Sequence, residues 1–156
     1  MDTIKKLINE IKIAMFVTQD EANGLRSRPM QTAQVDEDGT IWFFTSEFSG
    51  KVEEIQSDHP VNLSYASTDR QAYVSITGFA YLVDDQKKRS ALWNPIFKAW
   101  FPEGLDNGSV SLIKVVPVVA EYWEETDNKI KRLYYAGKAM LSGEKYAEGN
   151  HGKVSF

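Results

Sequence analysis

A short stretch of the sequence places hydroxyl groups and a lysine close together at the end of a predicted strand. Thr45 and Ser46 follow a run of large apolar residues at 41–44, and Ser49 and Lys51 open a helical pattern. A phosphate group needs several donors and a positive field, and hydroxyls, a helix N-terminus and a lysine supply both. The stretch therefore indicates a phosphate site. A plain turn, with Ser49 as N-cap and Lys51 in solvent, is the alternative.

The segment 26–30 is a second candidate, because two arginines precede a proline in it. Arg26 and Arg28 share one face of a predicted strand, and Pro29 cannot donate a hydrogen bond to a neighbouring strand. An arginine in this position can offer a fork of donors to the carbonyl groups of a heterocycle or to phosphate. Alternatively, both arginines face solvent and discourage aggregation at a sheet edge.

A third candidate is the aromatic face of a predicted short helix at 95–101. Phe97, Trp100 and Phe101 recur there at helical spacing. The face could close over a flat ligand or dock onto a partner subunit, and ordinary core packing is the other interpretation.

Other chemistry has little support in the sequence. The two histidines, His59 and His151, lie far apart, so no histidine-based metal site is expected. The glycine spacing of a nucleotide-hydrolysing P-loop and the elbow motif of serine hydrolases are both absent. The acidic residues at 36–38 and 84–85 are assigned to turns.

Composition narrows the class of protein. The chain has 156 residues, no cysteine and a formal charge of −4. This length predicts a single domain spanning 1–156, and the absence of cysteine excludes disulfides and thiol chemistry. The negative charge argues against nucleic-acid and anionic-membrane partners. With no signal-peptide pattern and no membrane-spanning run, we expect a cytoplasmic protein.

The elements that would position these residues form a mainly β pattern. Apolar runs, alternation and turn signals such as Asn23-Gly24 predict about six strands in an antiparallel barrel with flanking helices. Pro29 should lie at an edge, a bulge or a cavity rim, and Gly78 should mark a bulge or a tight bend. The expected strands cover 13–18, 26–35, 41–46, 61–66, 72–83 and 110–123, with a further short strand considered at 153–156. The expected helices cover 2–12, 51–55, 85–93, 95–101 and 130–141.

Taken together, the motifs resemble those of the pyridoxamine 5′-phosphate oxidase-like flavin-binding split barrels, and within them the general stress protein 26 branch. The resemblance runs from about residue 3 to 155, and its specificity lies in the order and spacing of the motifs. The segments that carry it are Ser27-Arg28-Pro29-Met30, Trp42-Phe43-Phe44-Thr45-Ser46, Ser49-Gly50-Lys51, Leu92-Trp93 through Trp100-Phe101-Pro102, and Ala120-Glu121-Tyr122-Trp123.

The resemblance implies a homodimeric split barrel with flavin mononucleotide (FMN) in a groove at the subunit interface. FAD or a deazaflavin would fit the same description. The resemblance further implies that the phosphate contacts Thr45, Ser46, Ser49 and Lys51. The isoalloxazine ring would lie beside Arg28, Met30 and Gln31, with the helix that carries Trp100 near the cofactor or the dimer contact.

Two departures from the pyridoxamine phosphate oxidases limit what the resemblance implies about the reaction. Gly50 stands where those enzymes have an arginine, and the chain ends in His151-Gly152-Lys153-Val154-Ser155-Phe156 in place of an Arg-Leu-x-Pro-like tail. We therefore expect no oxidation of pyridoxamine 5′-phosphate. The expected function is that of a stress-linked, flavin-dependent oxidoreductase of unidentified substrate, in which no catalytic side chain can be named. A non-catalytic flavin-binding or flavin-sensing protein is the alternative.

Overall fold

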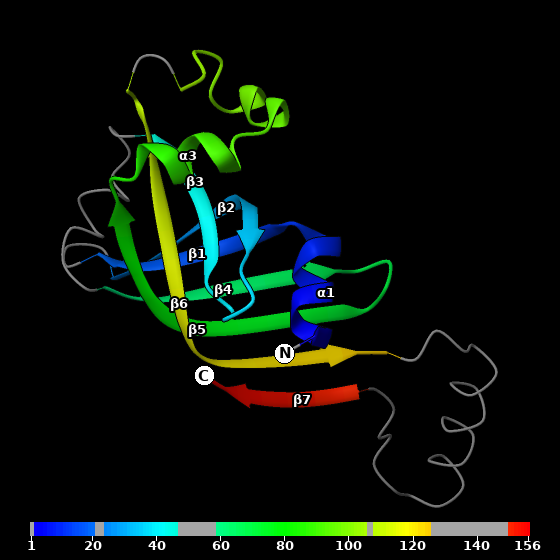
Figure 1. Cartoon of the computed structure of the whole chain (residues 1–156). Helices are drawn as coiled ribbons and strands as arrows, with labels where there is room; N and C mark the ends of the chain where they lie inside the picture. The colour runs from blue at the N-terminus through cyan, green and yellow to red at the C-terminus, as the bar shows by residue number, and fades with distance from the viewer. Residues whose placement is uncertain (1, 21–23, 47–58, 106–107, 126–149) are drawn as a thin grey trace, which may run out of the picture.

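The computed structural model describes residues 2–20, 24–46, 59–105, 108–125 and 150–156. Ser49, Lys51 and the predicted helices at 51–55 and 130–141 lie outside these ranges. Figure 1 shows the arrangement of the elements. In chain order they are α1 (Asp2–Ile11), β1 (Ile13–Asp20), β2 (Gly24–Val35), β3 (Ile41–Ser46), β4 (His59–Ser67), β5 (Ala72–Val83), α3 (Gln86–Leu92), the 3₁₀ helix η1 (Pro95–Ala99), β6 (Val110–Glu124) and β7 (Asn150–Ser155).

Six of the strands close into an antiparallel barrel, as the sequence predicted. Their order is β3-β2-β1-β4-β5-β6, and β3 also pairs with β6, which completes the ring. The first half of β6 makes that pairing, while its second half pairs with β7 outside the ring. β7 confirms the short strand considered at the end of the chain, although it already begins at Asn150.

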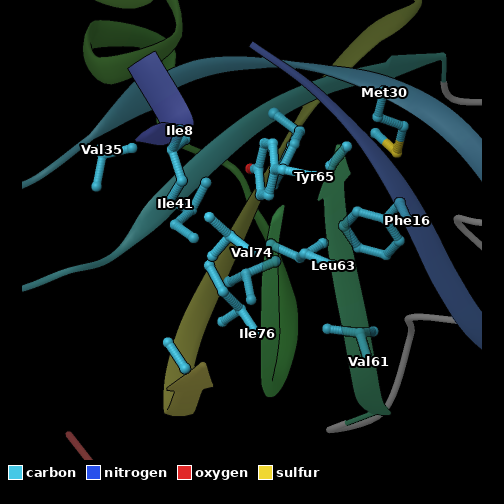
Figure 2. Packing of buried hydrophobic residues seen from close by; sticks show 14 of the residues in the cluster. Ile8, Phe16, Met30, Val35, Ile41, Val61, Leu63, Tyr65, Val74 and Ile76 are labelled. Carbon is cyan, nitrogen blue, oxygen red and sulfur yellow. The ribbon is translucent and has the colours of Figure 1, made fainter. Parts of the chain in front are cut away.

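Alternation along the strands fills the barrel with apolar side chains. Phe16, Leu63, Tyr65 and Ile76 are fully buried and point into the barrel (Figure 2), while their neighbours along the strands are half-buried or exposed. α1 covers one end of the barrel, because Ile4, Leu7 and Ile8 recur at helical spacing and join the same core. The hydroxyl of buried Tyr65 is bonded to Thr32 at 2.7 Å, so this polar group has a partner inside the core.

β3 is buried on both faces, which explains its uninterrupted apolar sequence. Ile41 and Phe43 join the barrel core, whereas Trp42 and Phe44 pack in a second cluster with Leu92 and Phe97. α3 and η1 supply that outer layer over β3 (Figure 1). The predicted helices at 85–93 and 95–101 are thereby confirmed, the second one as a 3₁₀ helix that begins at Pro95.

Gly78 occupies the bulge that the sequence predicted. The β5–β6 register shifts between Thr77 and Gly78, opposite Pro117. A Cβ atom on Gly78 would lie 2.3 Å from the carbonyl oxygen of Val116, so the two backbones approach too closely for any side chain. None of the helices in the described ranges combines the length and apolar character that crossing a membrane requires.

The acidic turn between β2 and β3 connects these strands and also bonds to side chains of β3 and α3. Its backbone closes as predicted, with the Asp36 amide donating to the Thr40 carbonyl at 2.8 Å. The Asp36 carboxylate also accepts the indole N–H of Trp42 at 2.7 Å, and Lys88 from α3 lies 3.4 Å away. Burial raises the pKa of Asp36, but hydrogen bonds from Trp42 and Gln34 and the charge of Lys88 outweigh it and hold the pKa below its usual range.

Candidate functional site

The barrel is split where β2 and β3 part from each other. The two strands pair only from Thr32 to Val35, with a register shift between Thr32 and Gln34. Beyond Phe43, β3 continues along β6, while the Gly24–Gln31 part of β2 stays on β1. Over that part, no described strand pairs with the side of β2 that faces away from β1.

A groove of about 200 Å³ occupies this split. One wall comes from β2, the other from the end of β3, and residues of η1 and the segment after it complete the lining. We call it the split groove, and its lining residues are Pro29, Met30, Gln31, Phe44, Thr45, Ser46, Phe97, Trp100 and Phe101. Of the residues predicted from sequence, the groove brings together Met30, Gln31, Thr45, Ser46 and Trp100.

The aromatic side chains of the groove divide into a floor and an exposed ring. Phe97 is only 4% exposed and packs edge-on against Phe44, with ring centroids 4.8 Å apart. Trp93 packs on the same two rings. Trp100, in contrast, is 54% exposed and lines the groove. Core packing is thus the correct interpretation for Phe97, whereas Trp100 is the most exposed aromatic residue of the groove and Phe101, also in the lining, is partly buried.

The hydroxyl residues lie at the end of β3. Thr45 follows Phe44 on β3, so its side chain points to the opposite face of the strand, and it is only 2% exposed. Ser46 is half-buried at the last position of the strand. Both line the split groove. Hydroxyls on one wall and an aromatic ring with open backbone on the other can hold an anionic group at one place and a planar, hydrogen-bonding ring at another.

Arg28 is absent from the residues that line the split groove. It pairs across from Phe16 on β1, and its guanidinium donates to the hydroxyl of Thr18 at 3.2 Å. Thr18 is fully buried, so the arginine is held at the barrel wall. Its contact with a ligand remains a prediction, as do the contacts of Ser49 and Lys51, which lie outside the described residues.

Sequence reasoning missed part of the groove. The sequence predicts Phe44 only as strand core, yet it forms the floor of the groove, because β3 and β2 diverge beside it. Pro29 was expected at an edge, a bulge or a cavity rim, and its place in the groove wall confirms this expectation. Among the described lining residues there is no carboxylate and no histidine, so the lining supplies binding groups and no evident proton-transfer group.

A family model and a curated protein both match most of the chain. The family model described as "Pyridoxamine 5′-phosphate oxidase like" matches residues 1–147. Among curated proteins, Protein bli-3 of Neurospora crassa is 27% identical over 154 residues, which cover 92% of this chain and 74% of that protein.

Solved structures agree on the fold. A protein of Jannaschia sp. CCS1, described as a candidate general stress protein 26, has a TM-score of 0.79 at 22% identity and covers 100% of both chains. The general stress FMN/FAD binding protein of Xanthomonas citri has a TM-score of 0.71 at 24% identity, covering 81% of this chain and 89% of its own.

Proposed function

Because the chain belongs to the pyridoxamine 5′-phosphate oxidase-like family, we propose that it binds a flavin nucleotide in the split groove. FMN is the preferred cofactor in this proposal, and FAD and a deazaflavin are its close alternatives. The similar Xanthomonas citri protein is described as FMN/FAD binding, and a protein from Nostoc punctiforme with a TM-score of 0.64 as FMN binding.

One observation carries the proposal: the split groove joins hydroxyls to an open strand edge and an exposed tryptophan. Thr45 and Ser46 would hold the phosphate end, together with Ser49 and Lys51 if these residues lie as the resemblance implies. The isoalloxazine ring would lie along Met30 and Gln31, where the free edge of β2 can meet its N–H and carbonyl groups. Trp100 would cover the ring. The residues present therefore fit a flavin.

A second copy of the chain would complete the site. Drug-sized ligands occupy pockets of roughly 300–1,000 Å³, and the split groove of one chain measures only about 200 Å³. The outer surface of β1, β4 and β5 is suited to a partner, since its outward residues carry no charge although 26% of the chain is charged. We define this uncharged face by Ile13, Met15, Asn62, Ser64, Tyr73, Ser75, Thr77 and Phe79.

The uncharged face has the composition of an interface core. The face exposes four large apolar side chains, each by about 40% (39–46%): Ile13, Met15, Tyr73 and Phe79. Apolar side chains gathered on neighbouring strands are typical of a surface that a partner covers. At its centre, Asn62 donates to Ser75 at 3.1 Å and accepts from Ser64 at 3.0 Å, so these polar groups already satisfy one another. Homodimerisation through this face would bury apolar surface and leave no charge unpaired.

Within this proposal the protein is a flavin-dependent oxidoreductase of unidentified substrate, and the names of its relatives suggest a role in stress. A bound flavin would supply electron transfer between a donor and a substrate. The side chains of the groove would bind and orient the ring and exclude water from it. A flavin-binding or flavin-sensing protein with little turnover is the second candidate, favoured by the absence of a proton-transfer group among the described lining residues.

The test is the visible absorption spectrum of the pure protein before and after incubation with FMN and desalting. We expect a retained flavin spectrum with about one flavin per chain, and mass spectrometry of the released compound would separate FMN, FAD and a deazaflavin. Protein that stays colourless would exclude the proposal. If flavin is bound, bleaching by a nicotinamide cofactor at a useful rate would favour the oxidoreductase over the binder.

A further inference from the structure

A second cavity of about 220 Å³ lies beside the split groove, and the two share Gln31 and Phe97 in their walls. The C-terminal end of α1, the middle of β2 and the start of η1 line it, and it is open to solvent, since Asn9, Lys12, Asn94 and Ile96 are exposed. We call it the helix-end cavity. Thr45 and Ser46 line the split groove and not the helix-end cavity, so the helix-end cavity adjoins the Gln31 end of the groove.

The lining of the helix-end cavity combines an apolar wall with hydrogen-bonding groups and one cation. Ile8, Ile96 and Phe97 contribute apolar surface. The polar lining residues are Asn9, Lys12, Gln31, Thr32 and Asn94. No carboxylate occurs among its described lining residues, and no described carboxylate forms a salt bridge with Lys12. The cavity therefore presents a net positive charge with amide donors around it.

The backbone at Lys12 ends the helix in a conformation that is unusual for a lysine. Lys12 ends α1 with φ at 67°, in the left-handed region where glycine is the favoured residue. Its amide donates to the Ile8 carbonyl at 2.8 Å, as a helix-ending residue does. A lysine in this conformation is strained relative to glycine, the residue that this helix end favours.

We propose that the helix-end cavity binds the substrate of the flavin, and that this substrate is a small organic acid. Lys12 would hold its carboxylate, and the amides of Asn9, Gln31 and Asn94 would bind its polar groups. The cavity is smaller than the roughly 300 Å³ at which drug-sized pockets begin, so a single ring or a short chain fits and a nicotinamide dinucleotide does not. The position beside the flavin ring rests on the proposed function, whereas the binding of an acid does not.

The carbonyl groups at the end of α1 oppose an anion, since a helix C-terminus carries about half a negative charge. Lys12 carries a full positive charge at the same place. Its backbone amide also donates a hydrogen bond to the Ile8 carbonyl, which satisfies one of the free carbonyl groups of the helix end. Glu10, the nearest acid along the helix, is paired with Arg70. The balance at the cavity is therefore positive.

The experiment compares acids with their uncharged amides. Acetate, pyruvate, benzoate and nicotinate, and the corresponding amides, are titrated into isotope-labelled full-length protein, and the backbone resonances of Thr32, Ala33 and Asn94 are followed by NMR. At least one acid should move these resonances to saturation and bind about tenfold more tightly than its amide, at the low end of what a hydrogen bond to a charged group contributes. Absence of any such shift, or equal affinity of each acid and its amide, would overturn the proposal.

Variants of Lys12 separate binding from structure. Lys12→Met keeps most of the apolar stem and should abolish the preference for the acid, whereas Lys12→Arg should retain it. Lys12→Gly should raise the melting temperature, because glycine relieves the positive φ, and should still lose the preference. Lys6→Met, which removes a charge from the exposed side of the same helix, is the matched control and should bind the acid unchanged. Retained preference in Lys12→Met would refute the assignment.

Parallel titrations with and without bound FMN distinguish this inference from the proposed function. If the protein binds the acid but takes up no flavin, the helix-end cavity is confirmed as an acid site, and the claim that it lies beside a bound flavin is refuted. Flavin binding without acid binding would leave the proposed function standing and overturn the inference. When both bind, the acid should shift the visible absorbance of the flavin through the shared Gln31 wall, and an unchanged spectrum would contradict the placement.

Discussion

Trp100 and Phe97 show how exposure separates a binding residue from a structural one within the same short segment. Both line the split groove, but Phe97 also joins the aromatic cluster around Phe44, and Trp100 does not. Truncation of the two side chains should therefore affect different measurements.

We expect Trp100→Ala to change the free energy of unfolding by no more than about 0.5 kcal/mol, as for other exposed positions. It should weaken FMN binding by about two- to tenfold, which corresponds to the loss of one aromatic contact. Phe97→Ala, the matched control, should lower stability by about 3–5 kcal/mol. Urea denaturation measures the stability and flavin titration the affinity. An unchanged FMN affinity in Trp100→Ala would show that the isoalloxazine ring does not contact Trp100.

The phosphate end of the site can be tested through Lys51. Lys51→Ala should weaken FMN binding by about 1.5–3 kcal/mol, the contribution of a charge-assisted hydrogen bond. Lys6→Ala removes the same charge from exposed α1 and should leave the affinity unchanged. Equal effects of the two variants would place the phosphate elsewhere.

Asp36 links the turn before β3 to α3, and it should make stability depend on pH. Its pKa in the folded protein lies below the ordinary value of 3.8, so the ionised carboxylate stabilises the fold above about pH 4. That stability is lost as the pH falls through the lowered pKa. Asp36→Asn should cost about 1–2 kcal/mol at pH 7 and flatten the acid limb of the stability curve. Glu37→Gln removes only a surface ion pair with Lys5 from a side chain that is 96% exposed, so it should cost less than about 1 kcal/mol and leave the acid limb unchanged.

At the scale of elements, the bulge between β5 and β6 offers a test of backbone proximity. Gly78→Ala places a Cβ atom against the Val116 carbonyl, which cannot move without distorting the strand, so we expect a loss of about 1–3 kcal/mol. Gly152→Ala meets the far end of the Tyr122 side chain, which can rotate away, and should cost less. Chemical denaturation ranks the two variants, and a larger loss at Gly152 would contradict this account of the bulge.

The sequence predicted the strands well because alternation, prolines and turn residues are local signals. Gly78 and Pro29 were placed correctly for that reason. The groove itself was not predictable, because it depends on where β2 and β3 stop pairing, and pairing joins residues far apart in the chain. The interaction of Asp36 with Trp42 and Lys88 was missed in the same way, since an acidic turn carries no sign of its distant partner.

At the scale of the whole molecule, the uncharged face predicts the oligomeric state. Met15 lies within this face, opposite Ser64 on β4 and 41% exposed in the single chain. Met15→Glu should convert a dimer to a monomer in light scattering, because burying an unpaired charge costs several kcal/mol. Thr68→Glu, in the exposed turn after β4, introduces the same charge outside the face and should leave the dimer intact. A dimeric Met15→Glu protein would place the interface elsewhere.

The pairing of β3 with β6 also has a consequence for biosynthesis. β2 and β3 leave the ribosome early, but Phe44 receives its β6 partner, Leu112, only after most of the chain has been made. Long-range pairing of this kind forms slowly. A nascent chain would therefore present its groove-forming strands long before it could retain a cofactor, and cofactor capture would report the completion of folding.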